Sequence, residues 1–267
     1  MASSHDTHAH GAHEHHHHEE SFVSKYIFSH DHKMIAKQFL MTAVFMGLVA
    51  MLLSILFRIQ LAWSGESSDF LSFFLGEQWA PKGILKENMY LGLVTIHGTI
   101  MVFFLLTGGL SGTFSNLLIP LQLGARDMAS GFLNMLSFWF FFLSSLIMFL
   151  SLFVSNGSIF GLDIPGDWGT IGNGPAMSGW TVYPPLSALP QAEAGSGLGM
   201  TLWLISMAIF IAGSLLGSLN YIVTVLNLRT AGMSMLRMPL TIWAFFVTAI
   251  LGVLSFPVLL SAALLLI

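Results

Sequence analysis

The sequence predicts an all-α protein, a polytopic bundle of about five transmembrane helices. Hydrophobic residues make up 55% of the 267 residues and charged residues only 8%, whereas a soluble domain has roughly 25% charged residues. The apolar residues gather in five stretches, each close to or above the roughly 20 residues that a helix needs to cross a bilayer core. We expect spans at residues 39–58, 90–119, 132–154, 198–226 and 240–267.

Composition excludes several kinds of site. There is no cysteine, so we expect no disulfide, no thiolate metal site and no cysteine-ligated iron–sulfur cluster. The net charge is −4 and no basic patch is present, which makes nucleic acid an unexpected partner. Membrane lipid is an expected one. The 16 Met and 23 Phe suit lipid-facing and core positions, and also the wall of a large flat cofactor.

Polar segments separate the spans. Residues 1–28 form a predicted disordered tail, because their first twenty residues contain eight His and four acidic residues in a low-complexity pattern. Loose binding of transition metals is a second interpretation of these histidines. Residues 61–86 and 155–197 are predicted loops, and the second is long, rich in Gly and Pro, and carries interfacial aromatic residues such as Trp180.

The basic residues predict the orientation. With the N-terminus inside, the inner segments hold six Lys or Arg and the outer loops hold two, with Arg58 at the outer edge of the first span. The inner ones are Lys25, Lys33, Lys37, Arg126, Arg229 and Arg237, and the outer ones are Lys82 and Lys86. The last span then ends at Ile267 without a polar anchor, so we expect a fragment or the front part of a longer chain.

His97 is the first candidate functional residue. It is the only acidic or basic side chain between Met89 and Pro120, and such a group at membrane depth is costly enough to suggest a function. Met101, Phe104, Gly108 and Gly112 follow it at helical spacing and are expected on one stripe, where small residues allow close approach of a helix or a flat ligand. Three interpretations stay open: an axial ligand of haem iron, a proton relay, or a packed histidine bonded to another helix.

Polar residues at the inner side form a second candidate site. Asp127 precedes the third span, Asn134 lies seven residues further on the same helical face, and Asn116 is near the inner end of the second span. A carboxylate that leads to buried amides describes the entrance of a water-filled proton path. The alternative is that Asp127 caps the third helix and Asn134 bonds across helices.

Two further features have two interpretations each. Arg58 is either an arginine that snorkels to the interface or a donor aimed at a buried carbonyl or propionate. The fourth span presents small and polar residues on one face, which favours a helix–helix contact first and a water path second. These residues are Ser206, Gly213, Gly217, Asn220 and Thr224.

Several stretches resemble subunit I of the haem–copper oxidases, in the A-type cytochrome c oxidase branch with a bacterial type of sequence. They are HDHKMIAKQ, LFRIQL, LGLVTIHGTIMVFF, SNLLIPLQLGARDMASGFLNMLSFW, GWTVYPPLSALP, GSLNYIVTVLNLRT and PLTIWAFFVTAILGVLSFPVLLSAALLLI. They keep their order from about Ser29 to Ile267. The resemblance implies a fold of about a dozen helices, of which this chain supplies the first five.

The resemblance also implies roles for single residues. His97 corresponds to an axial ligand of the low-spin haem, expected to be haem a, and Arg58 to the donor to its formyl group. Ser54 and Met101 correspond to positions that line this haem, and Gly179 and Trp180 to the loop that covers the haem propionates.

Other matched residues belong to a proton route. Asp127 corresponds to the acid at the mouth of the D pathway, Asn116 and Asn134 to its asparagine cluster, and Asn220 and Ser214 to polar positions further along. The resemblance implies that this chain does not contain the ligands of the high-spin haem a3 and of copper B. It also implies that the second axial histidine of the low-spin haem lies outside this chain. The chain therefore lacks the oxygen-reducing site, and no catalytic residue is assigned to it.

The expected function is that of a core subunit of a proton-pumping terminal oxidase in the bacterial inner membrane, with the N-terminus cytoplasmic. Electrons would come from cytochrome c, and the partners would be the copper-bearing subunit II, subunit III and the remainder of subunit I. A quinol oxidase is the alternative, because the donor is decided on another subunit. A non-enzymatic transporter is a remote alternative, since neither an internal repeat nor a carboxylate inside a span is found.

Overall fold

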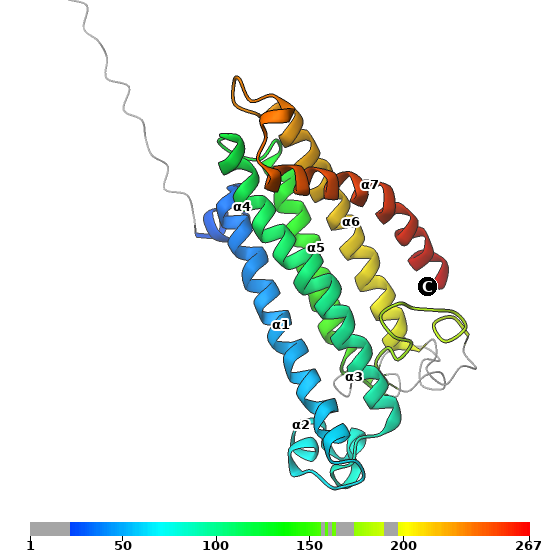
Figure 1. The fold of residues 1–267 in the computed structure, drawn as a ribbon. Coiled ribbons are helices and arrows are strands. Elements are labelled where there is room, and N and C mark those ends of the chain that lie inside the picture. The colour runs from blue at the N-terminus through cyan, green and yellow to red at the C-terminus, as the bar shows by residue number, and fades with distance from the viewer. Residues whose placement is uncertain (1–21, 156–157, 160–161, 164–173, 190–196) are drawn as a thin grey trace, which may run out of the picture.

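The computed structural model describes residues 22–155, 158–159, 162–163, 174–189 and 197–267, and within them it confirms the predicted all-α bundle. Five helices in this described part are long and apolar enough to cross a membrane, and they lie side by side in one bundle (Figure 1). They are His32–Ala62, Glu87–Leu123, Gly131–Ser151, Leu198–Asn227 and Leu240–Leu266. The third ends three residues earlier than predicted, where the chain turns into a short strand.

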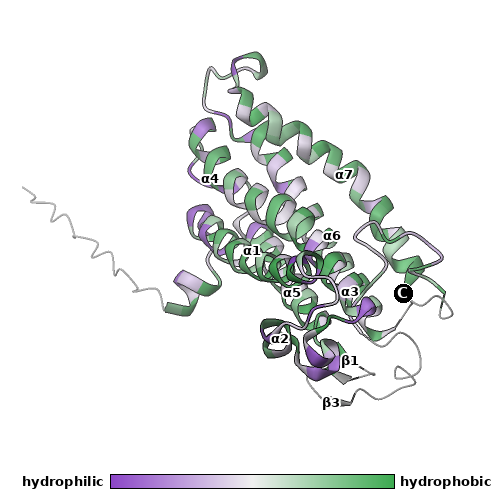
Figure 2. Cartoon of the chain, turned by 60° about the horizontal axis from the view of Figure 1, so that its bottom comes forward, coloured by the Kyte–Doolittle hydropathy of each residue, from purple (hydrophilic) through white to green (hydrophobic). Residues whose placement is uncertain are grey.

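The five spans carry the labels used below. The first is α1 (His32–Ala62), and the second combines α3 (Glu87–Thr99), the π-helix η3 (Ile100–Leu110) and α4 (Ser111–Leu123). The others are α5 (Gly131–Ser151), α6 (Leu198–Asn227) and α7 (Leu240–Leu266). Hydrophobic residues cover the spans, and hydrophilic residues gather at their ends and in the connections (Figure 2).

Short elements occupy some predicted loops. The predicted loop 61–86 contains α2 (Asp69–Trp79) and the 3-10 turn η2 (Pro81–Gly83). The predicted tail contains the π-helical turn η1 (Val23–Ile27), and its residues 1–21 lie outside the described part. The antiparallel strands β1 (Val154–Ser155), β2 (Ser158–Ile159) and β3 (Leu162–Asp163) open the long loop, and η5 (Met235–Arg237) precedes α7.

The second span changes helical type in its middle. In η3 the backbone is π-helical, and the Thr107 hydroxyl donates to the carbonyl of Val102, five residues earlier, at 2.7 Å. The wider π turn rotates later side chains relative to an α-helix. Phe104 is fully buried while Met101 is 38% exposed, so these two residues of the predicted stripe differ in exposure.

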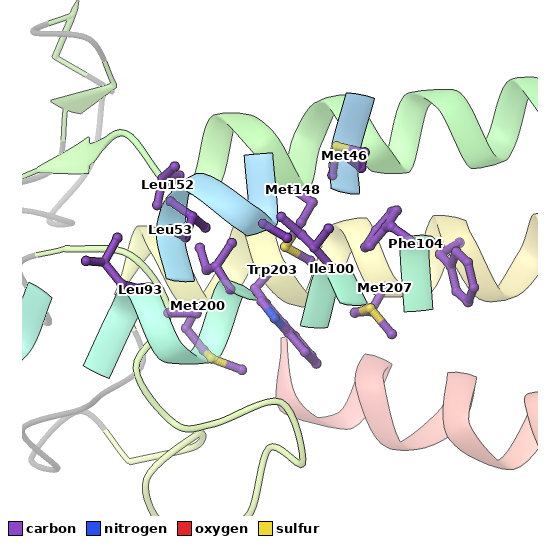
Figure 3. Close-up of a cluster of buried hydrophobic side chains, with 14 of the residues drawn as sticks. Met46, Leu53, Leu93, Ile100, Phe104, Met148, Leu152, Met200, Trp203 and Met207 are labelled. Carbon is purple, nitrogen blue, oxygen red and sulfur yellow. The ribbon is translucent and has the colours of Figure 1, made fainter. Parts of the chain in front are cut away.

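The core lies between the second span, α1, α5 and α6. Ile100, Phe104 and Trp203 gather there with methionine side chains from three helices (Figure 3). Small residues let α5 and α6 approach, because a Cβ on Gly213 would lie 2.7 Å from the Cβ of Phe140. The Ser206 hydroxyl also donates to the Ser144 carbonyl at 2.7 Å. The polar face of the fourth span is thus a helix–helix contact, as its first interpretation predicts.

Candidate functional site

His97 is held by a backbone carbonyl of the neighbouring helix. Its Nδ1 lies 2.8 Å from the Ala50 carbonyl oxygen on α1. A carbonyl only accepts hydrogen bonds, so Nδ1 carries the proton and Nε2 keeps its lone pair. Phe57 stands edge-on to the ring, with the centroids 5.6 Å apart. The contact that a packed histidine would make is therefore present, and it is also the contact that orients a metal-binding histidine.

His97 offers a single imidazole nitrogen as a donor. A single donor would suit a metal that brings its own equatorial ligands. Among the described residues, no group of three or more His, Cys, Asp or Glu side chains could hold a bare ion. An iron porphyrin needs only axial ligands from the protein, and a neutral imidazole nitrogen is the commonest one. The donor set at His97 therefore fits a haem.

The loop that carries Gly179 and Trp180 lies against the helix that carries His97. The Gly179 amide donates to the Thr95 hydroxyl at 3.0 Å, in a turn where Gly179 has φ +81°. A Cβ on Gly98, the residue after His97, would lie 3.1 Å from Cδ1 of Trp180. The structure thus places Gly179 and Trp180 against the span that carries His97, through Thr95 and Gly98.

The other predicted haem residues lie on the same two spans, Ser54 and Arg58 on α1 and Met101 on the second span. Ser54 and Arg58 follow Ala50 on α1 at one and two turns, and Ser54 is half-buried while Arg58 is exposed. Met101 lies one turn after His97 and is also exposed. The exposed side chains near the Ala50–His97 contact are accessible to a group held between helices. Both interpretations of Arg58 therefore stay open.

Asp127 does not cap the third span. The N-cap of α5 is Ser130, whose hydroxyl accepts from the Leu133 amide at 3.3 Å. The Asp127 carboxylate instead accepts from the amide of its neighbour Met128 at 2.7 Å. The predicted capping alternative is therefore wrong, and the reason is that the helix begins four residues after Asp127.

The segment that carries Asp127 is held by α6. The Asn220 side-chain amide makes two bonds to Ser130: its oxygen accepts from the Ser130 amide at 3.0 Å and its nitrogen donates to the Ser130 carbonyl at 3.1 Å. The Thr224 hydroxyl accepts from the Ala129 amide at 2.9 Å. Asn220 and Thr224 thus position the turn between the second and third spans.

The amides above this turn have unused hydrogen-bonding capacity. Asn134 is fully buried, and neither its side-chain oxygen nor its nitrogen has a partner within the described residues. The Asn116 nitrogen donates to the Gly112 carbonyl at 2.8 Å, but its oxygen is also without a partner there. The predicted bond of Asn134 across helices is not formed. Buried polar atoms in this state are ordinarily satisfied by water.

A cavity of about 230 Å³ lies beside these amides, between the second span, α5, α6 and α7. It has room for several water molecules. Most of its lining is apolar, from residues such as Phe39, Phe141 and Phe245, and the polar residues on it include Ser111, Ser137, Ser214, Ser218 and Tyr221. The predicted residue Ser214 therefore lies on this cavity. Sequence reasoning did not single out Tyr221, although it directly follows Asn220.

Fold and site together define a polytopic helical membrane protein with a histidine held by a backbone carbonyl of the neighbouring helix and with buried amides near a cavity between the spans. Residues 34–267 match the family model described as cytochrome c and quinol oxidase polypeptide I. The chain belongs to this family, and the resemblance seen in the sequence is confirmed. Membership implies haem and copper as cofactors of the family's oxidases and association with other oxidase subunits.

The relatives carry corresponding names. An alternative cytochrome c oxidase subunit 1 from Bradyrhizobium diazoefficiens is 41% identical over 239 residues, which cover 90% of this chain and 35% of the relative. Cytochrome c oxidase subunit 1 of Cereibacter sphaeroides is 33% identical over 265 residues, covering 94% of this chain and 43% of the relative. The chain thus spans well under half the length of these relatives.

Proposed function

We propose that this chain is the N-terminal part of subunit I of a proton-pumping terminal oxidase of the bacterial inner membrane, with its N-terminus in the cytoplasm. The whole enzyme would take electrons from cytochrome c and reduce oxygen to water, with subunits II and III and the remainder of subunit I as partners. The observation that carries the proposal is the 2.8 Å bond from His97 Nδ1 to the Ala50 carbonyl. The names of the relatives support the reaction.

In this proposal His97 binds the iron of the low-spin haem, expected to be haem a, which supplies one-electron redox chemistry when bound. The Ala50 carbonyl holds the ring in one tautomer and directs Nε2 away from α1. Around that nitrogen, Arg58, Ser54 and Met101 would line the haem edge, and Gly179 and Trp180 would cover its propionates. The high-spin haem a3 and copper B would be held by residues beyond those of this chain.

Asp127 would take protons from the inner side. Asn220 holds the turn that carries it, and Asn116 and Asn134 offer free amide atoms to a file of water molecules. Ser214 lies further along, on the cavity between the spans. The excess of Lys and Arg on the proposed inner side supports this orientation.

The test is a reduced-minus-oxidised absorption spectrum of the assembled enzyme with His97→Ala. We expect loss of the low-spin haem a band, whereas His30→Ala, at an exposed histidine just before α1, should keep it. Retention of the band in His97→Ala would refute the ligand assignment. A haem b band alone in the unaltered enzyme, together with oxidation of quinol rather than cytochrome c, would establish the quinol oxidase alternative, which the family description includes.

A further inference from the structure

Tyr221 is a polar side chain at the boundary between the buried amides and the cavity. Its oxygen accepts a hydrogen bond from the Asn116 side-chain nitrogen at 3.3 Å, and its side chain is part of the cavity lining. It lies on α6 directly after Asn220, which faces the turn below. Tyr221 therefore touches both polar regions of the inner half.

The phenol of Tyr221 lies close to Gly217 on the same helix. A Cβ on Gly217 would lie 3.7 Å from the Tyr221 oxygen and 3.9 Å from the Cβ of Ser137. The phenol thus lies back along α6 over Gly217 and close to α5. Ser137 lines the same cavity, and its hydroxyl donates to the Asn134 carbonyl at 2.7 Å. Tyr221 and Ser137 consequently connect this cavity with the two asparagines, Tyr221 to the Asn116 side chain and Ser137 to the Asn134 backbone.

The direction of the hydrogen bonds gives the phenol two roles. It accepts from Asn116, so its own O–H remains a donor. A hydroxyl hydrogen rotates about its C–O bond, so the O–H can point to water in the cavity that the side chain lines.

We propose that Tyr221 is a positioning residue of the proton route, which fixes the Asn116 amide and orients water between the asparagine cluster and the cavity that its side chain lines. This inference rests on the proposed function. Tyr221 stays neutral throughout: it accepts one hydrogen bond, donates another, and the proton travels on water. Its ring packs beside the apolar side chains of Ile119, Val225 and Ile242, so the oxygen can be removed while the packing is kept.

The experiment uses Tyr221→Phe in the whole oxidase, with Tyr26→Phe as the matched control, because the Tyr26 phenol is exposed and outside the spans. Proton uptake during single turnover, its solvent isotope effect and the rate of haem reduction by the donor are measured in each variant. We expect proton uptake in Tyr221→Phe to slow by about two- to tenfold, as loss of one hydrogen bond would give. The isotope effect should change as well, while haem reduction and the haem spectrum stay as in the unaltered enzyme.

The outcomes are distinguishable. Normal proton uptake in Tyr221→Phe, with slow uptake in Asp127→Asn, would overturn the role of Tyr221 and leave the proposed function in place. Normal uptake in both variants would overturn the proton route itself. Loss of assembled enzyme or of the haem band in Tyr221→Phe, but not in Tyr26→Phe, would make the hydroxyl a packing element and would also overturn the inference.

Discussion

Gly108 lies in the π-helical part of the second span, where the helix is pressed against α5 and α6. A Cβ at this position would lie 2.6 Å from Cε2 of Phe141 and 2.7 Å from Cε2 of Phe210. Both rings are almost fully buried, and Phe104 packs on each of them, with its ring centroid 6.1 Å from Phe141 and 5.4 Å from Phe210. A retreat of either ring would change its contact with Phe104.

The cost of Gly108→Ala follows from these distances. Carbon atoms in contact prefer a separation of about 3.5–4.0 Å, so each ring would have to retreat by about 1 Å. Overpacking of this kind costs about 1–3 kcal/mol. Replacing glycine by alanine in a helix stabilises the helix by roughly 1 kcal/mol. A matched control is therefore needed to separate this gain from the cost of overpacking.

Gly47→Ala on α1 is that control. The nearest atom to its Cβ would be Cδ1 of Leu105 at 3.3 Å, the end of a flexible side chain. We expect Gly108→Ala to be less stable than Gly47→Ala by about 1–3 kcal/mol, measured by denaturant titration of the purified protein in detergent. If the two variants unfold at the same denaturant concentration with equal slopes, the close packing of η3 against α5 and α6 is wrong.

Three further predictions concern polar contacts. Asp127→Asn should slow turnover and leave the haem spectrum unchanged, because only the proton entrance is altered; full turnover and full pumping would contradict the role. Asn220→Ala removes two bonds to Ser130 and should cost about 1–3 kcal/mol in the free energy of unfolding, which a denaturation curve with no shift would exclude. Thr99→Val removes the acceptor, at 3.0 Å, of the buried Trp203 indole N–H. It should cost about 1–3 kcal/mol, checked by the same titration and by a change in tryptophan fluorescence.

The five spans could be predicted because apolar length and charge asymmetry are properties of the sequence alone. His97 could also be found, since a basic side chain within an apolar stretch is visible without a structure. Its bond to the Ala50 carbonyl could not, because it joins residues 47 positions apart through the packing of two helices. The π-helix was likewise missed, because helical spacing in a sequence assumes one period throughout.

The inner site shows a second limit. Asp127 and Ser130 are both good N-cap residues, so the sequence did not indicate which of them begins the helix. Tertiary contact decides it, because Asn220 holds both backbone polar groups of Ser130. Tyr221 was overlooked for a related reason: a tyrosine near the end of an apolar span looks interfacial, and only the approach of Asn116 from another helix gives its oxygen a buried partner.

One design recurs in the polar groups of this bundle. Nδ1 of His97 bonds a backbone carbonyl, and Nε2 has no partner among the described residues. The side-chain nitrogen of Asn116 donates to Gly112 and Tyr221, and its oxygen has no partner among the described residues. In a membrane each free atom costs about 1–3 kcal/mol unless a ligand or water satisfies it. Because the committed half of each group fixes its orientation, the free half points in one direction. In a bilayer, such groups destabilise the protein unless something satisfies the free atom. In the proposed function, a metal satisfies Nε2 of His97 and a file of water molecules satisfies the oxygen of Asn116.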